Sequence, residues 1–148
     1  MANAEIVYCS MTGNTQACAE IVYEKLKDLG VDVDIHDCTT VDPEDVFEDA
    51  ELCIVGTYTY GEGDMPDEII DFYEDMQEMD LTGKIFGAFG SGDTFYEEFC
   101  RNVEDFDRAF EACGATRGAD LVKVDLYPEE ADKAHLEAFA AELASKIQ

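Results

Sequence analysis

One stretch near the start of the chain decides the fold: Ile6-Val7-Tyr8-Cys9-Ser10-Met11-Thr12-Gly13-Asn14-Thr15. Its first four residues form a short apolar run, β-branched at its start, which is typical of a buried strand. The next six are rich in hydroxyl and amide side chains and include a glycine, as in a loop. Ala19, Val22, Leu26 and Leu29 follow at positions i, i+3, i+7 and i+10, which lie on one face of a helix. The stretch therefore predicts a strand, a loop and a helix in that order.

The same order of strand and helix is repeated along the rest of the chain. Residues 31–35 alternate apolar and acidic side chains, which predicts a half-buried strand at the edge of a sheet. Residues 52–56 form an apolar run, as in a strand covered on both faces. Further strands are predicted at 84–90 and 121–126. Two helices are predicted to begin near Pro43 and Pro66. Two more are predicted: one that contains Phe99 and ends at Gly114, and one over 129–147.

Five strands that alternate with helices predict an α/β fold, a doubly wound parallel sheet with helices on both faces. The length of 148 residues fits a single domain over 1–148. In such sheets, ligands bind beyond the carboxyl ends of the strands, at the point where the strand order reverses. The loops after the first, third and fourth predicted strands are therefore the candidate site.

The charge of the chain is strongly negative. Nine Lys and Arg side chains face 36 Asp and Glu side chains, which gives a net charge of −27. This charge opposes binding to nucleic acid and to an anionic membrane face, since both need a basic surface. There is no Lys or Arg between Lys27 and Lys84. The carboxylates are either a surface for solubility or salt adaptation, or an acidic docking face for basic partners.

The cysteines predict neither disulfides nor a metal site. No C-x-x-C pair is present, and two histidines give no metal-ligand spacing. No apolar run approaches the roughly 20 residues of a membrane span, and no basic leader precedes the first strand, so we expect neither a signal peptide nor an anchor. A reducing compartment, the cytoplasm, is expected for the six thiols, which are Cys9, Cys18, Cys38, Cys53, Cys100 and Cys113.

The first loop, Ser10–Thr15, combines three kinds of group that bind anions without a cation. Its hydroxyls donate hydrogen bonds, its glycine permits a tight approach, and the helix that follows offers free backbone N–H groups. Ser, Thr and Asn also cap ordinary helices, so the composition alone leaves a plain capping loop open.

The other two loops add aromatic side chains. Thr57–Asp64 alternates tyrosine and threonine before two glycines, and Gly90–Cys100 joins glycines to Phe95 and Tyr96. Aromatic rings at the ends of buried strands suit a flat ligand that stacks on them. Each tyrosine taken singly is more often a half-buried rim residue, but two such loops beside a phosphate-type loop favour a flat phosphorylated ligand.

Three other phosphate-handling classes fail on particular residues. A P-loop needs G-x-x-x-x-G-K-[ST], and the first loop has no lysine and one glycine. A low-molecular-weight tyrosine phosphatase needs a cysteine, five intervening residues and then an arginine, and Thr15 stands at that position after Cys9. A response-regulator receiver domain needs an aspartate at the end of the third strand, where Gly56-Thr57 stands.

The chain resembles the flavodoxins of the short-chain type over its whole length. The resemblance is carried by residues 6–15, by Gly56-Thr57-Tyr58-Thr59-Tyr60-Gly61 and by Gly90-Ser91-Gly92-Asp93-Thr94-Phe95-Tyr96. It implies a flavodoxin-like sheet of strand order 2-1-3-4-5 and a non-covalent FMN. The implied cofactor-binding residues are Ser10, Met11, Thr12, Gly13, Asn14, Thr15, Thr57, Tyr58, Thr59, Tyr60, Gly61, Ser91, Gly92, Asp93, Tyr96, Glu98, Phe99 and Cys100.

The resemblance also implies separate roles for these residues. Ser10, Thr12, Asn14 and Thr15 would hold the phosphate, together with the backbone N–H groups from Met11 to Thr15. The isoalloxazine ring would lie between Tyr60 and Tyr96. Its pyrimidine edge would meet main-chain groups of Asp93, Glu98 and Cys100. The ribityl chain would lie near main-chain groups of Tyr58 and Thr59.

Gly61 corresponds to the glycine whose carbonyl turns, in flavodoxins, to accept a hydrogen bond from N5–H of the reduced flavin. A peptide flip of this kind is cheap only at glycine. The sequence departs from the common pattern at three positions. Tyr60 stands where tryptophan is frequent, Met11 fills a slot that is more often polar, and Cys9 is an uncommon neighbour of the loop.

The resemblance implies an electron-transfer protein rather than an enzyme: a low-potential, monomeric one-electron carrier. Its partners would be redox proteins with basic docking faces. They would meet an exposed flavin edge ringed by acidic side chains, namely Glu62, Asp64, Asp67 and Glu68. An FMN-dependent quinone or nitro reductase with its own substrate is the alternative, although no second nucleotide motif is visible.

Overall fold

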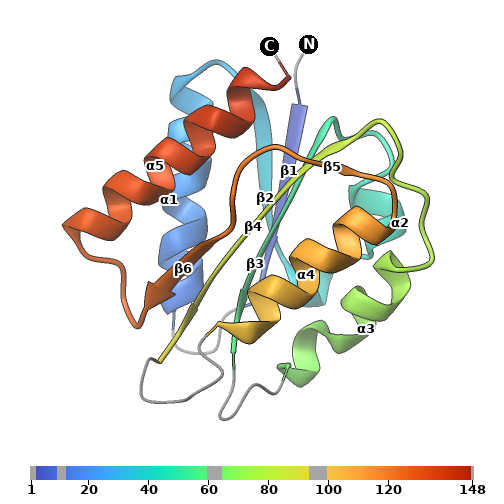
Figure 1. The fold of residues 1–148 in the computed structure, drawn as a ribbon, viewed down its shortest axis with the longest axis horizontal. Coiled ribbons are helices and arrows are strands. Elements are labelled where there is room, and N and C mark those ends of the chain that lie inside the picture. The colour runs from blue at the N-terminus through green and yellow to red at the C-terminus, as the bar shows by residue number, and fades with distance from the viewer. Residues whose placement is uncertain (1–2, 10–12, 60–64, 94–99, 148) are drawn as a thin grey trace.

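The computed structural model describes residues 3–9, 13–59, 65–93 and 100–147. Strands and helices alternate along the chain, as predicted, and Figure 1 shows them as one sheet between two layers of helices. The elements in chain order are β1 (Asn3–Tyr8), α1 (Asn14–Asp28), β2 (Asp32–Asp37), the 3₁₀ helix η1 (Cys38–Thr40), α2 (Pro43–Val46), β3 (Leu52–Tyr58), α3 (Asp67–Met76), β4 (Ile85–Gly92), α4 (Arg101–Ala112), β5 (Thr116–Arg117), β6 (Val122–Asp125) and α5 (Glu130–Ser145).

The predicted strand order is confirmed, with one correction at its end. The order is β2-β1-β3-β4, and all neighbours are parallel. The fifth place is shared by β5 and β6, which pair with the start and the end of β4. From Arg117 to Val122 the chain takes five steps while β4 takes three, from Phe86 to Phe89, so the fifth strand bulges between its two pieces. The predicted strand at 121–126 is the second piece alone.

The third and fourth strands extend further than the apolar pattern predicts. The ladder between β3 and β4 continues through the pairs Thr57–Gly90 and Tyr58–Ser91. Polar side chains and glycine at these positions are typical of loops, but backbone pairing with a neighbouring strand outweighs that local preference. Thr57, Tyr58, Ser91 and Gly92 therefore stand on strands rather than in loops.

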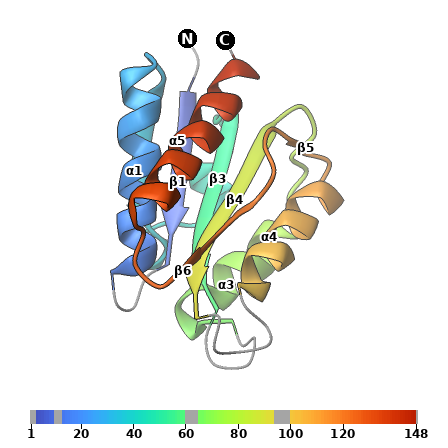
Figure 2. The same cartoon turned by 60° about the vertical axis from the view of Figure 1, so that its left-hand side comes forward.

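Two hydrophobic clusters fill the two sides of the sheet. Ile6 and Ile54 pack with α1 and α5 in one cluster, and their neighbours Val7 and Val55 face α3 and α4 in the other. This is the period-two alternation of a strand covered on both faces. Figure 2 shows α1 and α5 together on one side of the sheet, and α3 and α4 on the other.

The ends of α1 follow the predicted signals, with one exception. Gly30 has a φ of +84° directly after the helix and stops it, as predicted. Leu29, however, is 37% exposed, because the helix ends at Asp28 and Leu29 is the capping residue. No described helix is long and apolar enough to cross a membrane.

Gly90 marks the closest approach between α4 and the sheet. A Cβ built on Gly90 would lie 2.3 Å from both the Thr57 carbonyl oxygen and Val103 Cγ2. The absence of a side chain at this position lets α4 rest directly on the ends of β3 and β4.

We expect Gly90→Ala to lower the free energy of unfolding by about 1–3 kcal/mol, the usual range for overpacking. The Thr57 carbonyl belongs to a hydrogen-bonded strand and cannot move aside. Gly87→Ala is the matched control, because its Cβ would meet only the ends of the Leu143 and Phe139 side chains, at 2.8 Å. Urea denaturation should show a smaller loss for Gly87→Ala; equal losses would contradict this account of the packing.

Candidate functional site

Buried polar side chains gather at the carboxyl end of the sheet. Among the described residues, four of the five stand on different elements at this end: Thr15 on α1, Thr57 on β3, Ser91 on β4 and Asn102 on α4. The fifth, Asp107, lies further along α4 and pairs with Arg117. Burying polar groups is costly unless they are hydrogen-bonded, so a concentration of them distinguishes this end of the molecule.

A short hydrogen bond joins α1 to the end of β4. The Thr15 and Ser91 hydroxyl oxygens are 2.6 Å apart, and the two side chains are 1% and 3% exposed. Thr15 lies in the first turn of α1, and Ser91 is the second-last residue of β4. This contact holds the start of α1 beside the end of β4.

The start of α1 is suited to an anion. Its capping residue, Gly13, has a φ of +91° and no side chain to cover the first N–H groups of the helix. A Cβ at Gly13 would contact nothing within 4 Å, and the first turn of α1 carries no acidic side chain. A helix that begins at a glycine and has no carboxylate in its first turn offers its partial positive charge to a phosphate.

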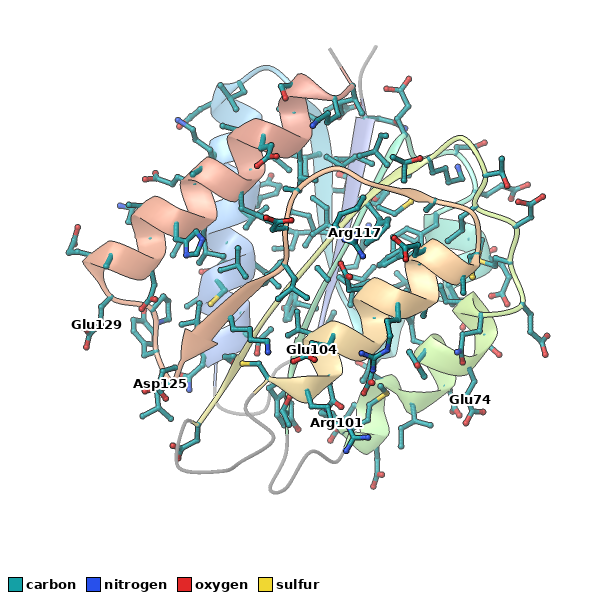
Figure 3. All side chains as sticks on the ribbon, viewed as in Figure 1. Glu74, Arg101, Glu104, Arg117, Asp125 and Glu129 are labelled. Atoms are coloured by element: carbon teal, nitrogen blue, oxygen red, sulfur yellow. The ribbon has the colours of Figure 1, made fainter. Side chains whose placement is uncertain are left out.

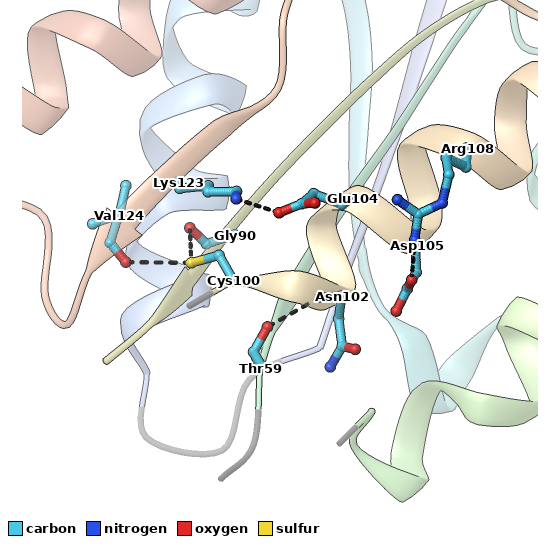
Figure 4. A network of polar contacts seen from close by, with 9 residues as sticks. All are labelled: Thr59, Gly90, Cys100, Asn102, Glu104, Asp105, Arg108, Lys123 and Val124. Carbon is cyan, nitrogen blue, oxygen red and sulfur yellow. Dashed lines mark hydrogen bonds and ion pairs between the residues drawn. The ribbon is translucent and has the colours of Figure 1, made fainter. Parts of the chain in front are cut away.

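A second set of contacts ties β3 to β4 and to α4. The Thr59 N–H donates to the Ser91 carbonyl at 3.2 Å. The Asn102 N–H donates to Thr59 Oγ1 at 3.1 Å, and Asn102 Nδ2 donates to the Tyr58 carbonyl at 3.1 Å. Figure 4 shows Asn102 at the start of α4, facing Thr59.

The cysteines near this end are thiols without nucleophilic character. A hydrogen bond with the Cys38 thiol, together with burial, raises the pKa of Cys9 far above its ordinary value. Burial raises the pKa of Cys100 to about 12. Phosphatase chemistry needs a thiolate, so the structure agrees with the sequence in excluding it.

Cys100 has an unusual backbone. Its φ of 53° and ψ of 31° are left-handed, and it is the capping residue at the start of α4. Its side chain is fully buried, with Sγ 3.9 Å from the carbonyl oxygens of Gly90 and Val124. Since the side chain turns into the core, any ligand contact at this position falls to the main chain.

Charges around the site are mostly paired or acidic. Lys123, which lies opposite Gly90 in the ladder, is held by the Glu104 carboxylate. Figure 3 shows Arg101 and Asp125 toward the lower end of the sheet, where β3 and β4 finish, and Arg117 well above them. Among the described residues, no group of three His, Cys, Asp or Glu side chains could hold a metal ion.

The structure brings the described members of the predicted site together at this end of the sheet. They are Gly13, Asn14, Thr15, Thr57, Tyr58, Thr59, Ser91, Gly92, Asp93 and Cys100. The remaining predicted residues lie outside the described ones: Ser10, Met11, Thr12, Tyr60, Gly61, Tyr96, Glu98 and Phe99.

Sequence reasoning missed Asn102. Its amide stands beside the apolar face of α4 formed by Val103, Phe106 and Phe110. A polar residue next to such a face is commonly a solvated edge, and only its burial to 1% exposure shows that it belongs to the site.

Comparisons with known proteins identify the family. The family model described as Flavodoxin matches residues 6–139. The chain is 38% identical over 146 residues to the probable flavodoxin 2 of Bacillus subtilis (strain 168), covering 99% of this chain and 97% of that protein. The structure of a flavodoxin from Streptococcus pneumoniae TIGR4 superposes with a TM-score of 0.96 at 58% identity, covering 99% of this chain and 100% of that one.

The short-chain form is also represented among solved structures. A short-chain flavodoxin associated with a PDU bacterial microcompartment has a TM-score of 0.97 and 45% identity, with both chains fully covered. These relatives are named as flavodoxins, which does not favour a reductase with a substrate of its own. The chain belongs to the flavodoxin family, and it is an FMN-binding electron-transfer protein rather than an enzyme.

Proposed function

We propose that residues 1–148 act as one unit, a low-potential carrier that binds FMN non-covalently at the carboxyl ends of β1, β3 and β4. The observation that carries this proposal is the group of buried polar side chains there, built around the Thr15–Ser91 hydrogen bond of 2.6 Å. When bound, FMN supplies the one-electron chemistry, and the protein supplies its position and electrostatic surroundings.

The residues at the start of α1 fit the phosphate. In the proposed site, Ser10, Thr12, Asn14 and Thr15 bind it, together with the backbone N–H groups from Met11 to Thr15. The support lies in the part of the loop that is described, where the capping residue is a glycine and the first turn carries no carboxylate. Hydrogen bonds from hydroxyl and backbone groups then balance the phosphate without a lysine or arginine.

The residues after β3 and β4 fit the ring. In the proposed site, Tyr60 and Tyr96 cover its two faces, and main-chain groups of Asp93, Glu98 and Cys100 meet its pyrimidine edge. Tyr58 pairs with Ser91 on the neighbouring strand. The segments that follow β3 and β4 therefore begin side by side. The other proposed contacts are those of Met11, Gly13, Thr57, Tyr58, Thr59, Gly61, Ser91, Gly92 and Phe99.

The acidity of the chain favours a low second potential. The second electron adds negative charge at the ring, within a chain of net charge −27. Each carboxylate close to that charge costs on the order of 1–4 kcal/mol at the effective dielectric of a protein surface. With no Lys or Arg between Lys27 and Lys84, little offsets this cost.

We further propose that the carrier is a cytoplasmic monomer that docks transiently with basic redox partners. Asp67 and Glu68 are exposed in the first turn of α3, close behind the segment that would cover the ring. Glu62 and Asp64, also expected on this face, lie outside the described residues. The cysteines support a reducing compartment, since all six are free thiols and five are buried.

An anaerobic redox titration with FMN tests this function. We expect two separated one-electron steps, the second at a much lower potential. A colourless apoprotein that does not bind FMN would overturn the proposal. Reduction in a single two-electron step would instead favour a reductase with its own substrate.

Gly61→Ala should lower the first one-electron potential in the same titration. Loss of a hydrogen bond worth about 1 kcal/mol to the reduced flavin corresponds to roughly 40 mV in a one-electron couple. Gly83→Ala is the matched control, because it also replaces a glycine by alanine. Gly83 lies in the turn before β4, at the opposite end of the strand, and has a φ of +90°. It should reduce stability and leave both potentials unchanged. An unaltered first potential in Gly61→Ala would refute the role of this glycine.

Asp67→Asn/Glu68→Gln should slow electron transfer to a basic acceptor and reduce its dependence on salt. Steering by exposed charges weakens within a Debye length of about 10 Å at 0.1 M salt. Glu44→Gln/Asp45→Asn removes the same charge from the first turn of α2, which Figure 1 places away from the ends of β3 and β4. Stopped-flow rates at several salt concentrations compare the two. Equal effects would mean that the acidic face near α3 serves solubility alone.

A further inference from the structure

Asn102 occupies a position that the family motifs do not explain. It is 1% exposed and lies two residues beyond Cys100, at the start of α4. Its contacts cross 43 and 44 residues of sequence to Thr59 and Tyr58, the last two described residues before Tyr60 and Gly61. A buried amide therefore stands between the two segments that the proposed function places around the flavin ring.

We propose that Asn102 is a positioning residue for the flavin: it clamps the end of β3 to the start of α4, so that the segments on either side of the ring keep a fixed separation. This inference rests on the proposed function. It concerns the ring and ribityl chain and leaves the phosphate untouched.

The clamp consists of two hydrogen bonds that Asn102 donates to neighbouring residues of the other segment. The side-chain Nδ2 donates to the Tyr58 carbonyl at 3.1 Å, and the backbone N–H donates to Thr59 Oγ1 at 3.1 Å. Thr59 N–H in turn donates to the Ser91 carbonyl at 3.2 Å. Three elements, β3, β4 and α4, are thereby joined at a single point, part of which is drawn in Figure 4.

The Tyr58 carbonyl is where the side chain matters most. Tyr58–Ser91 is the last pair of the β3–β4 ladder, so strand pairing no longer orients the chain beyond it. The carbonyl also receives a longer contact of 3.4 Å from Thr57 Oγ1. Without the Asn102 amide, the peptide after Tyr58 loses its well-placed donor and must be ordered when the flavin binds.

The phosphate end is held by different contacts. Thr15 reaches β4 through Ser91 Oγ, whereas the clamp uses the Ser91 carbonyl and the two bonds of Asn102 to Tyr58 and Thr59. Loosening the clamp should therefore weaken FMN and riboflavin, which lacks the phosphate, by the same factor.

The experiment titrates wild-type and Asn102→Ala apoproteins with FMN and with riboflavin, followed by quenching of flavin fluorescence. We expect both dissociation constants to rise roughly fivefold to tenfold in the variant, the loss of about one hydrogen bond. The first one-electron potential should also shift, whereas a purely structural role would leave it unchanged.

Asp107→Ala is the matched control on the same helix. Asp107 lies five residues beyond Asn102. The variant removes its ion pair with Arg117, in which Arg117 Nε lies 3.0 Å from Asp107 Oδ1. It should destabilise α4 and leave both dissociation constants within twofold of the wild type.

Two results would overturn the clamp: unchanged flavin affinities and potential in a folded Asn102→Ala protein, or a loss confined to FMN. If Asn102→Ala does not fold, Thr59→Val removes the acceptor from the other half of the clamp and should give the same paired losses.

Hydrogen exchange of the unaltered apoprotein adds a test without any variant, since the Thr59 and Asn102 amides should be protected. Rapid exchange at both would refute the clamp, whereas a wild-type protein that binds no flavin would refute the proposed function instead.

Discussion

The parallel arrangement of the sheet is the constraint on which the rest of the structure depends. All strands end at the same edge, so the backbone groups just beyond the ladder lose their strand partners together. Such groups are costly to bury without hydrogen bonds. Side chains meet part of this need, since Asn102 Nδ2 and Thr57 Oγ1 donate to the Tyr58 carbonyl and Thr59 Oγ1 accepts from the Asn102 N–H. Beside them, the Thr15 and Ser91 hydroxyls satisfy each other at 2.6 Å. The same polar side chains and open N–H groups are what a phosphorylated, flat cofactor requires.

The close packing of α4 follows from the same edge. Gly90 has no side chain, so α4 can rest on the ends of β3 and β4. This approach brings Asn102 within hydrogen-bond distance of Tyr58 and Thr59. The left-handed backbone of Cys100 turns the chain into that helix, and its buried side chain fills the space behind it. Packing and site geometry therefore depend on each other, since the helix that covers the core also carries Asn102, which holds the two residues before Tyr60.

The charge of the chain acts at two ranges. Close to the proposed flavin site, the stretch between Lys27 and Lys84 contains no Lys or Arg to offset added negative charge. Further away, the proposed docking of basic partners relies on exposed carboxylates such as Asp67 and Glu68, whose attraction has a range set by salt. Lys123, a cation near the site, is paired with the Glu104 carboxylate. The proposed low potential and the proposed salt-sensitive docking therefore have the same physical origin.

Periodicity in the sequence was enough to predict the α/β class, the edge position of β2 and most helices, because apolar side chains must face a core at fixed spacing. The loop motifs were enough to point to the family. The pattern could not reveal that Thr57, Tyr58, Ser91 and Gly92 continue the strands, because long-range backbone pairing outweighs their loop-like composition. Nor could it show the bulge between β5 and β6, or that Leu29 caps a helix instead of packing beneath it.

The site divides in the same way. Thr15 and Ser91 were each predicted from their own motifs, but their contact joins residues 76 positions apart and exists only in the folded chain. Asn102 carried no signal at all, since a single amide beside an apolar helix face looks solvated until β3 is placed against it. The sequence by itself determined which residues could bind a flavin phosphate and ring, because those preferences are local chemistry. Only the tertiary structure decided which of them meet, because contacts between distant segments depend on strand order and on how closely the helices pack.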